Sequence, residues 1–444
     1  MIGAGPKGMA LAAKAAVLFQ IYGDDTPRVV LLDNNDTGAH WSGNFGYTDG
    51  THALATPPLK DVGFPYRSRD WGSGNRKVNL DMLAYSWQAF LVDEPGTRAR
   101  AFDDWVDRGL PAPSLSTWAE YLKWVERRLD TTVDHHKVCK IDIERGQWRV
   151  SVEKDGTVHP LEPGQGLVIT GPGPARRARK QVDSGNRVTD AQNFWLNRRN
   201  IRKRIEKDAG KDKSIGIVGD GGAAASVIMS ILERCPKANV KVISPMGVTY
   251  TRGESYDENR HYSNTSDWVM LNKKSREKFI QHTSSGVFST QVKRVINDAE
   301  NLETACGEVA SIVGDSKRVT IDFAEDDINP STGKKRTAER FDFVIVAMGF
   351  DAMWWSAPRI LGKDARGVIN SCVRGGMDFD SLGDSVGRHL EVSNMLPKLH
   401  LPMLAAMQQG PGFPGLGSLG LLSDRILSAY CGETLADRLD DEYP

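Results

Sequence analysis

The sequence has few cysteines, no long hydrophobic run and no excess charge of either sign. Its five cysteines are scattered, without a CxxC pair or metal-ligand spacing, which favours unpaired, reduced thiols. No apolar run approaches the roughly 20 residues that span a membrane, and the start lacks a basic region followed by an apolar one. The 57 basic and 57 acidic residues balance, so nothing in bulk attracts nucleic acid. We therefore expect a cytoplasmic globular protein of two or three domains, with no nucleic-acid partner and no membrane span.

A glycine-rich turn opens the chain. It has the GxGxxG spacing, with glycines at Gly3, Gly5 and Gly8. A turn of this kind cradles a pyrophosphate when a strand precedes it and a helix follows. An Ala- and Leu-rich segment does follow, and then an apolar strand that ends at Asp33, where such folds hydrogen-bond ribose hydroxyls. Because only Met1 and Ile2 stand before the turn, we expect the first strand of this unit to lie mostly upstream of residue 1.

The same signal returns in the middle of the chain, in the stretch SIGIVGDGGAAASVIMSIL. Its turn carries Gly219 and Gly221, with Ala224 in the third glycine position. The strand after its helix ends at Ser244 rather than at an acid, so no carboxylate repels a 2′-phosphate, which favours NADPH over NADH. Arg252 is a candidate phosphate partner, although a solvated surface arginine is an equal alternative. Two such units in one chain indicate dinucleotide binding far more specifically than one unit does.

Two further apolar runs, GLVITGPG and FDFVIVAMGF, are typical of buried strands that turn at Gly171 and Gly349 beside a ligand. They flank the second unit and suggest two crossings between domains. The sequence therefore predicts an α/β fold with two dinucleotide-binding (Rossmann-like) domains. We expect an FAD domain in 1–205, an inserted NADPH domain in 206–344, and the rest of the FAD domain in 345–444. The basic segment RRNIRKRIEKDAGKDK is most simply a solvated helix face.

Several longer motifs separate the enzyme classes that share this architecture. Disulfide reductases need a cysteine pair that the sequence lacks. The segments WSGNFGYTDGTHALATPPLKDVGFPYRS, SYDENRHYSNTSDW and QQGPGFPGLGSLGLLSDRILSA, in this order, resemble the amine N-hydroxylating flavin monooxygenases of siderophore biosynthesis. The resemblance is strongest to the lysine N6-monooxygenases of mycobactin-type and nocobactin-type siderophores. It extends through nearly the whole chain.

This resemblance implies an activity. FAD takes a hydride from NADPH, O2 adds to give a C4a-hydroperoxide, and the lysine side-chain amine takes the distal oxygen. The substrate is a small molecule, lysine or a lysine-containing siderophore precursor. Family members form dimers and tetramers, so a homo-oligomer is compatible with the resemblance. Helical segments around 255–295 are expected to close the substrate site.

The resemblance also assigns residues. Lys60 matches the lysine that contacts the substrate carboxylate, and Asn259 matches the substrate-binding asparagine. Ser423 matches a serine near the reactive amine and the flavin, and Trp41 matches the tryptophan of the flavin loop. Taken alone, Lys60 is more simply a surface charge or a local ion pair, and Asn259 a turn or cap residue. Ser423 also fits the N-cap of a helix.

Departures from the ornithine hydroxylases favour a longer amine. Their second asparagine has Ser284 as its best match, their flavin-contacting glutamine falls at about Ala55, and the serine of their NADPH loop falls at Ala223. A lysine amine with a pKa of about 10.4 must lose its proton before it reacts, and a cation such as Lys60 and desolvation both favour that loss. Hydroxylation of ornithine or a diamine, and a non-catalytic dinucleotide-binding protein, are the alternatives. The histidines His40, His52 and His261 receive no role.

Overall fold

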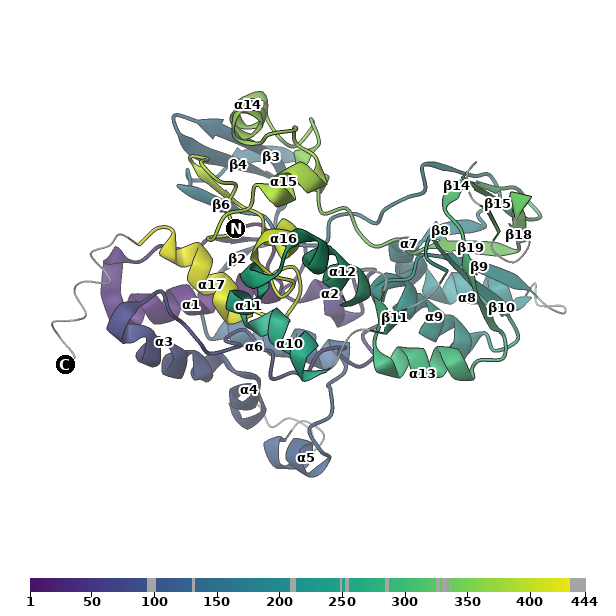
Figure 1. The fold of residues 1–444 in the computed structure, drawn as a ribbon, viewed down its shortest axis with the longest axis horizontal. Coiled ribbons are helices and arrows are strands. Elements are labelled where there is room, and N and C mark those ends of the chain that lie inside the picture. Colours follow the sequence, from purple (N-terminus) through teal and green to yellow (C-terminus); the bar gives the residue numbers. More distant parts are fainter. Residues whose placement is uncertain are drawn as a thin grey trace.

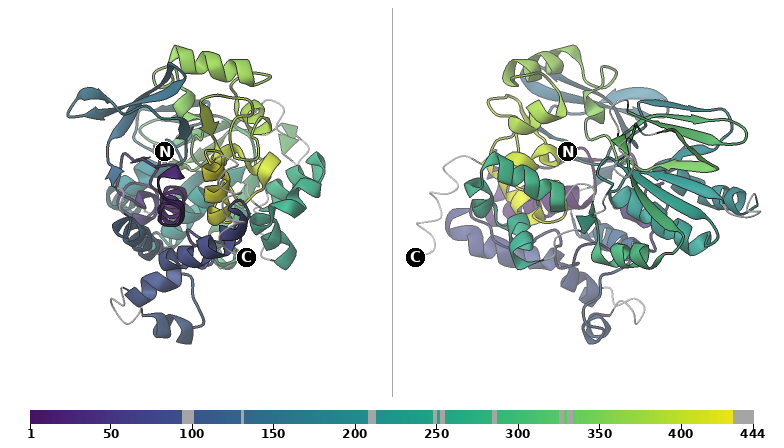
Figure 2. Two further views of the ribbon diagram at one scale, coloured as in Figure 1. Left: turned by 90° about the vertical axis from the view of Figure 1, so that its left-hand side faces the viewer. Right: turned by 45° about the vertical axis from the view of Figure 1, so that its right-hand side comes forward.

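The computed structural model describes most of the chain. The described residues are 1–93, 101–129, 132–207, 213–247, 250–251, 255–283, 287–324, 328–329, 334–335 and 337–431. They form two α/β units that lie side by side, with a group of short helices in front of them (Figures 1 and 2). Within these residues, no helix is long and apolar enough to cross a membrane, and no group of His, Cys, Asp or Glu is arranged to hold a metal ion.

The first unit is built around a short parallel sheet at the start of the chain. Ile2 bridges β1 on one side and Ile169 on the other, so a single residue occupies the central position. Its N–H donates to Val168 O and its carbonyl accepts from Thr170 N. The strands of this sheet are β1 (Leu31–Leu32), β2 (Val133–Asp134), β6 (Gly166–Val168) and β20 (Lys398–His400), with β1 paired to β2 and β6 to β20.

Helix α1 (Pro6–Tyr22) covers this sheet. Its Ala-rich sequence is mostly buried up to Leu18, with Pro at the first helical position and Gly23, at a positive φ of 70°, as the C-cap. It packs on α17, the last described helix of the chain, and on α3 and α6 (Figure 1). These helices are α3 (Asn75–Met82), α6 (Leu115–Arg127) and α17 (Leu419–Ser428). The pairing of α1 with α17 brings the two ends of the described chain together.

An antiparallel sheet and several small helices complete the first unit. In α6 the side chains of Trp118 and Trp124 are buried in the core of this unit, on the apolar face of an amphipathic helix. Helix α14 packs on strand β3. The remaining elements are β3 (Lys137–Glu144), β4 (Gln147–Lys154), β5 (Thr157–Pro160), α2 (Ala39–Ser42), α4 (Trp87–Asp93), α5 (Phe102–Asp107), α14 (Lys363–Cys372), α15 (Phe379–Asp384) and α16 (Ala406–Gln409).

The second unit contains a five-stranded parallel sheet in the order β13-β10-β9-β19-β8. Helix α9 (Gly222–Arg234) follows its central strand, as in a dinucleotide-binding unit. A second sheet, in the order β18-β15-β14-β7, packs beside it. The strands are β7 (Lys180–Asp183), β8 (Val188–Asp190), β9 (Ser214–Val218), β10 (Asn239–Ser244), β13 (Leu302–Cys306), β14 (Val309–Gly314), β15 (Val319–Phe323), β18 (Glu339–Phe341) and β19 (Phe343–Val346).

The strand pairing differs from the expected division of the chain. Strand β8 pairs with β19, and β19 pairs with β9. The second unit therefore begins before residue 206 and ends after residue 344, because both flanking strands satisfy their backbone hydrogen bonds in its parallel sheet. The chain crosses between the units near Gly171 and Gly349, as expected, and both glycines have positive φ (89° and 79°).

Short helices lie in front of the first unit and reach towards the second (Figure 1). Helix α12 packs on strand β11, on the side of the second unit, and on helix α16 of the first unit. These helices are α10 (Tyr256–Ser263), α11 (Thr265–Met270) and α12 (Lys273–Thr283). The paired strands β11 (Tyr250–Thr251) and β12 (Val287–Phe288) flank them in the sequence, and α13 (Thr290–Asp298) packs on α9 of the second unit. The helices expected around 255–295 are therefore present. A separate pair, β16 (Ile328–Asn329) and β17 (Lys334–Lys335), and the helices α7 (Ala191–Leu196) and α8 (Arg198–Lys207) complete the chain.

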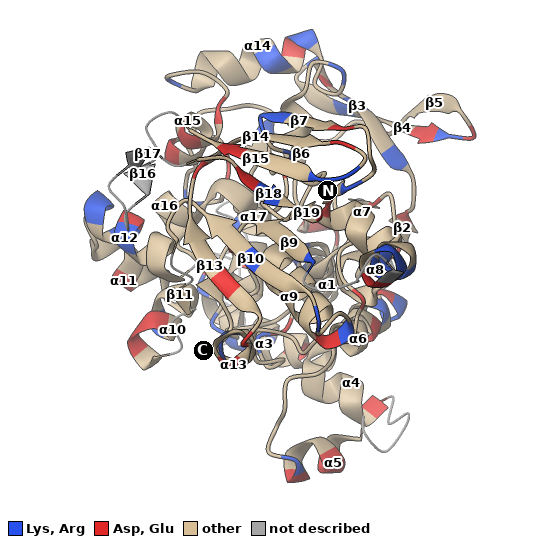
Figure 3. Ribbon diagram, turned by 90° about the vertical axis from the view of Figure 1, so that its right-hand side faces the viewer, with Lys and Arg blue, Asp and Glu red and all other residues tan. Residues whose placement is uncertain are grey.

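Charges of both signs are spread over the surface, with a cluster of Lys and Arg on α8 (Figure 3). Arg199, Lys203 and Arg204 are exposed there, whereas Ile205 is buried in the core of the second unit. This segment is the solvated helix face that the basic run predicts.

Candidate functional site

The first glycine turn has the geometry of a dinucleotide cradle. Gly3 has a φ of 110°, and a Cβ at this position would clash with the Thr170 hydroxyl. A Cβ at Gly8 would clash with the Gly3 carbonyl oxygen, so helix α1 approaches the turn as closely as only glycine allows. Gly5 is the N-cap of α1. These contacts fit a turn that brings its backbone close to a pyrophosphate.

Asp33 stands beside this turn at the end of β1. Its Oδ2 accepts from Ala4 N (2.7 Å) and its Oδ1 from Asn35 N (2.9 Å). Burial raises the pKa of this carboxyl, and the two backbone hydrogen bonds partly offset the rise. The carboxylate is thus fixed next to the turn, where a ribose of a bound dinucleotide would lie.

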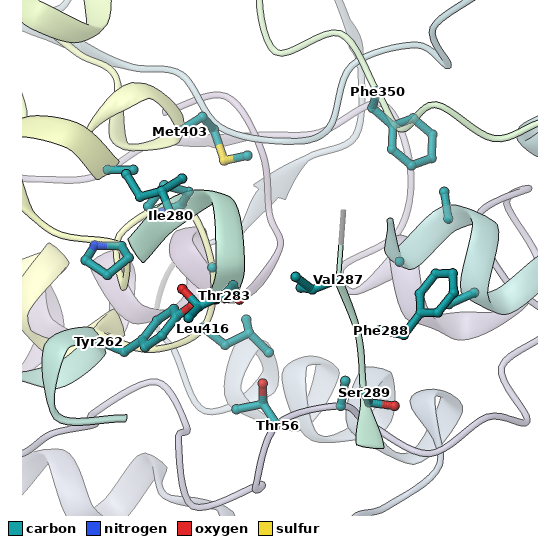
Figure 4. A pocket seen from close by; sticks show the side chains of 18 of the residues that line it. Thr56, Tyr262, Ile280, Thr283, Val287, Phe288, Ser289, Phe350, Met403 and Leu416 are labelled. Carbon is teal, nitrogen blue, oxygen red and sulfur yellow. Dashed lines mark hydrogen bonds between the residues drawn. The ribbon is translucent and has the colours of Figure 1, made fainter. Parts of the chain in front are cut away.

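A cavity of about 1420 Å³ opens between the two units (Figure 4). Loops of the first unit, helix α9 of the second and the short helices in front of them all contribute to its wall. The wall is mostly apolar and aromatic, as is usual for a cofactor or ligand site. Its labelled residues in Figure 4 are Thr56, Tyr262, Ile280, Thr283, Val287, Phe288, Ser289, Phe350, Met403 and Leu416.

Four rings cluster at one side of this cavity. His40 stacks on Tyr47 with centroids 4.7 Å apart, and the edge of Trp41 meets His40 at the same distance. Phe350, directly after Gly349, lies 5.4 Å from Tyr47. Burial, reinforced by the positive charge of Lys7, lowers the pKa of His40 to about 4, so its ring is neutral at pH 7.

This cluster was only partly predicted. Trp41 was expected at the cofactor, and it lines the cavity about 3.8 Å from where a Cβ on Gly5 would be. His40 and Tyr47 were not expected to line it, because an isolated histidine or tyrosine in a loop has no distinctive spacing. The position of Gly349, one residue before a lining aromatic side chain, was the available signal.

The second glycine turn faces the same cavity. Gly219 has a φ of 124°, Gly221 is the N-cap of α9, and Ala224 is fully buried against the sheet. Ala223, where the ornithine hydroxylases carry a serine, lines the cavity, and so does Gly222. A Cβ at Gly221 or Gly222 would meet nothing within 4 Å, so this turn has open space in front of it.

Lys60 and Asn259 meet beside the cavity, although 199 positions separate them. The Lys60 ammonium donates to Asn259 Oδ1 at 2.8 Å. The Lys60 Nζ lies 5.9 Å from the ring centroid of Phe64 and 6.0 Å from that of Tyr262, a residue of the cavity wall. The two predicted substrate-binding residues therefore form one polar pair, framed by aromatic rings. Asn259 lies inside α10, so it is neither a cap nor a turn residue.

A buried carboxylate holds the loop that carries Lys60. Asp61 Oδ1 accepts from Gly63 N (3.1 Å) and from the Tyr66 hydroxyl (2.8 Å), and Oδ2 accepts from Trp87 N (2.9 Å). Burial raises the pKa of Asp61 to about 6, and these hydrogen bonds moderate the rise. With three groups bonded to one carboxylate, the loop presents Lys60 in a fixed direction.

Ser423 does not lie where the N-cap interpretation places it. It is the fifth residue of α17, and the N-cap is Ser418. The Ser423 hydroxyl is fully buried and donates to Gly420 O (2.9 Å) and Leu419 O (3.2 Å) within the helix. A serine inside a helix commonly bonds backward in this way. Ser423 is absent from the cavity wall, and its role at the flavin stays a prediction.

Its neighbour Asp424 forms a buried ion pair that sequence inspection did not single out. The Lys14 ammonium lies 2.6 Å from Asp424 Oδ1, and both side chains are 1% exposed. Ser68 Oγ and Trp71 Nε1 also donate to Asp424 Oδ1. The pair fastens α17 to α1 and to the segment after the Lys60 loop. Arg252 and Ser284, the remaining candidates, lie outside the described residues.

Three comparisons identify the relatives of this chain. A family model described as L-lysine 6-monooxygenase/L-ornithine 5-monooxygenase matches residues 84–352. The L-lysine N6-monooxygenase MbtG of Mycobacterium sp. (strain MCS) is 36% identical over 437 residues, 98% of this chain and 96% of the relative. MbtG of Mycobacterium tuberculosis (strain ATCC 25618 / H37Rv) is 34% identical over 434 residues, 97% of this chain and 94% of that protein.

Solved structures agree with the sequence relatives. The lysine monooxygenase NbtG from Nocardia farcinica is 33% identical, with a TM-score of 0.79 over 96% of this chain and 97% of that chain. The ornithine N-hydroxylase KtzI of Kutzneria sp. 744 has a TM-score of 0.70 at 15% identity, over 97% of each chain, and supports the fold alone. The expected α/β fold with two dinucleotide-binding units is thereby confirmed.

Proposed function

The chain belongs to the L-lysine 6-monooxygenase/L-ornithine 5-monooxygenase family, and on that premise we propose that it hydroxylates the N6 amine of L-lysine. The reaction would use FAD, NADPH and O2 and supply a hydroxylamine for a hydroxamate siderophore. The observation that carries the proposal is the Lys60–Asn259 pair, whose ammonium lies 6.0 Å from the ring of Tyr262 in the wall of the cavity between the two dinucleotide-type turns.

The residues at both turns fit the two cofactors. At the first, Gly3, Gly8 and Asp33 leave room for a backbone approach and offer a carboxylate to a ribose, which suits FAD. At the second, the open space before Gly221 and a strand that ends at Ser244 suit NADPH. When bound, FAD accepts the hydride of NADPH and activates O2 for transfer of one oxygen atom to an amine.

The substrate would be held by its amino-acid end. The Lys60 ammonium is a partner for the lysine carboxylate, and the Asn259 amide is a neutral hydrogen-bonding group for the same end of the molecule. The positive charge of Lys60 and the apolar wall both disfavour a second ammonium in the cavity. The reacting amine would therefore lose its proton to solvent before it enters, because only the neutral amine has a lone pair for the oxygen.

The cavity wall would also limit access of water. Tyr262, Ile280, Met403 and Leu416 form an apolar surface on the side of the short helices (Figure 4). Such a wall protects activated oxygen from wasteful decay. The proposal places the reaction in the cytoplasm, a reducing compartment that suits the five cysteines, which are all free thiols.

The test measures N6-hydroxylysine by mass spectrometry together with NADPH oxidation, in FAD-loaded protein given lysine, ornithine, cadaverine or no amine. The proposal predicts product with lysine and an NADPH consumption that matches it. Product only with ornithine or cadaverine would move the chain to the alternative substrates. Absence of FAD binding would instead favour the non-catalytic alternative.

A further inference from the structure

Lys7 is a cation inside the first glycine turn. It is the second residue of α1, and its ammonium donates to the carbonyl oxygen of Pro414 at 2.7 Å. Pro414 belongs to the wall of the large cavity, so the ammonium lies at the edge of the site between the glycine turn and the C-terminal loop. No part of the resemblance assigned a role to Lys7.

The position is unfavourable for a positive charge. The first turn of a helix is the positive end of its dipole, and the first turn of α1 contains no acidic residue. Within the described part of the chain, no carboxylate forms an ion pair with Lys7. Burial lowers the pKa of Lys7 to about 8. A local conflict of this kind is typical of a functional position, where a ligand supplies the missing charge.

The turn also has hydrogen-bond donors to spare. Pro6 has no N–H. The first backbone N–H of α1 that bonds to a carbonyl of its own helix turn is that of Met9, which donates to Gly5 O at 3.0 Å, so the N–H groups before it point out of the helix end. The ammonium of Lys7 has three hydrogens, of which the Pro414 carbonyl takes one. His40, whose pKa the charge of Lys7 helps to lower, is neutral and adds no negative charge.

We propose that Lys7 binds the diphosphate of FAD, as a charged donor that supplements the backbone N–H groups of the glycine turn. The inference rests on the proposed function, because it assigns FAD to this turn. A diphosphate would neutralise the ammonium and the helix terminus together, and Pro414 would hold the side chain in place. Lys7 would then link cofactor binding to the C-terminal loop of the cavity wall.

The test compares the dissociation constants of apoprotein for FAD and for riboflavin, which lacks phosphate. Lys7→Gln removes the charge and keeps a donor for Pro414, Lys7→Met removes both, and Lys7→Arg keeps the charge. Lys77→Met, at an exposed pair with Asp81 on α3, is the matched control. We expect FAD binding to weaken roughly tenfold to a hundredfold in the Gln and Met variants, with riboflavin binding unchanged. The Arg and control variants should bind FAD within a few fold of the unaltered protein.

Other outcomes would overturn the inference. Unchanged FAD affinity in Lys7→Gln would exclude a contact with the diphosphate, and an equal loss for FAD and riboflavin would leave Lys7 as a tie between the turn and Pro414. Far-UV circular dichroism of the apoprotein checks the fold, and Lys7→Gln carries the test if Lys7→Met does not fold. Failure of the unaltered protein to bind FAD would contradict the proposed function itself, which separates the two failures.

Discussion

Lys60 donates a hydrogen bond to Asn259 across 2.8 Å, and so joins a loop of the first α/β unit to helix α10. The contact matters because each residue was expected independently to bind the amino-acid end of the substrate. A preformed pair lowers the cost of ordering the two side chains when substrate arrives.

Removal of either partner should weaken lysine turnover. In Lys60→Ala and in Asn259→Ala we expect kcat/KM for lysine to fall roughly a hundredfold, because each variant loses a hydrogen bond to a charged group. The FAD content should stay the same. Since the residues are in contact, the double variant should lose less than the product of the two single effects. Lys77→Ala is the control, and normal lysine turnover in both single variants would contradict the assignment.

The carboxylate behind Lys60 gives a pH-dependent test. Asp61→Asn should lower the free energy of unfolding by about 1–3 kcal/mol, because an amide hydrogen would face the Trp87 N–H. The folded pKa of Asp61 is raised from 3.8 to about 6, so its contribution is full below pH 4 and is lost as the pH rises through 6.

Urea unfolding at pH 4, 5, 6 and 7 measures this. The penalty of Asp61→Asn, relative to the unaltered protein, should be largest at pH 4 and shrink towards pH 7. Asp81→Asn, at a surface pair, should show no such trend. A penalty that grows with pH would show that the carboxylate is stabilised in its charged form.

The sequence predicted most of what depends on local pattern. Both glycine turns, the acid at Asp33 and the strands before Gly171 and Gly349 follow from spacing and apolar runs, because those features act within a few residues. The proximity of Lys60 and Asn259 came from a resemblance and not from any local rule. The membership of β8 in the second sheet was missed, because Val188 of β8 pairs with Val344 of β19 and strand pairing between segments so far apart in sequence gives no local signal.

Features that arise from long-range packing could not be predicted from the sequence. The polarity of LLSDRILSA allowed an N-cap at Ser423, yet the helix begins five residues earlier because Leu419 and Leu422 pack in the core. The burial of the Lys14 side chain could not be predicted from its local sequence, because its partner Asp424 lies 410 positions away.

Removal of one partner of the Lys14–Asp424 pair should destabilise the protein strongly, whereas replacement of both partners by apolar residues should destabilise it less. Lys14→Met should lower the free energy of unfolding by about 3–5 kcal/mol, because it leaves a carboxylate unpaired in the core. The double variant Lys14→Met/Asp424→Leu should recover part of that loss. Urea unfolding of the three proteins measures the effect, with Lys77→Met as a surface control. A double variant less stable than Lys14→Met would show that the pair stabilises the fold more than apolar packing does.

Acid should destabilise the protein in part through His400. Its Nδ1 donates to His389 O, its Nε2 accepts from the Tyr430 hydroxyl, and burial lowers the pKa of His400 to about 4. An unfolded histidine titrates near 6.5, so this stability is full above pH 6.5 and is lost as the pH falls towards 4.

His400→Gln should therefore make the free energy of unfolding less sensitive to pH between 6.5 and 4. His159→Gln is the control, since the side chain of His159 is exposed. Equal acid sensitivity in His400→Gln and the unaltered protein would show that His400 is protonated without loss of its contacts.

Under the proposed function, this chain transfers one atom of O2 to N6 of lysine. FAD-loaded protein, NADPH and unlabelled lysine under ¹⁸O2, followed by tandem mass spectrometry of the product, test it most directly. We expect a hydroxylysine that carries one ¹⁸O on its side-chain nitrogen and whose rate of formation falls sharply in Lys60→Ala. NADPH consumption with labelled hydrogen peroxide and unmodified lysine would contradict it.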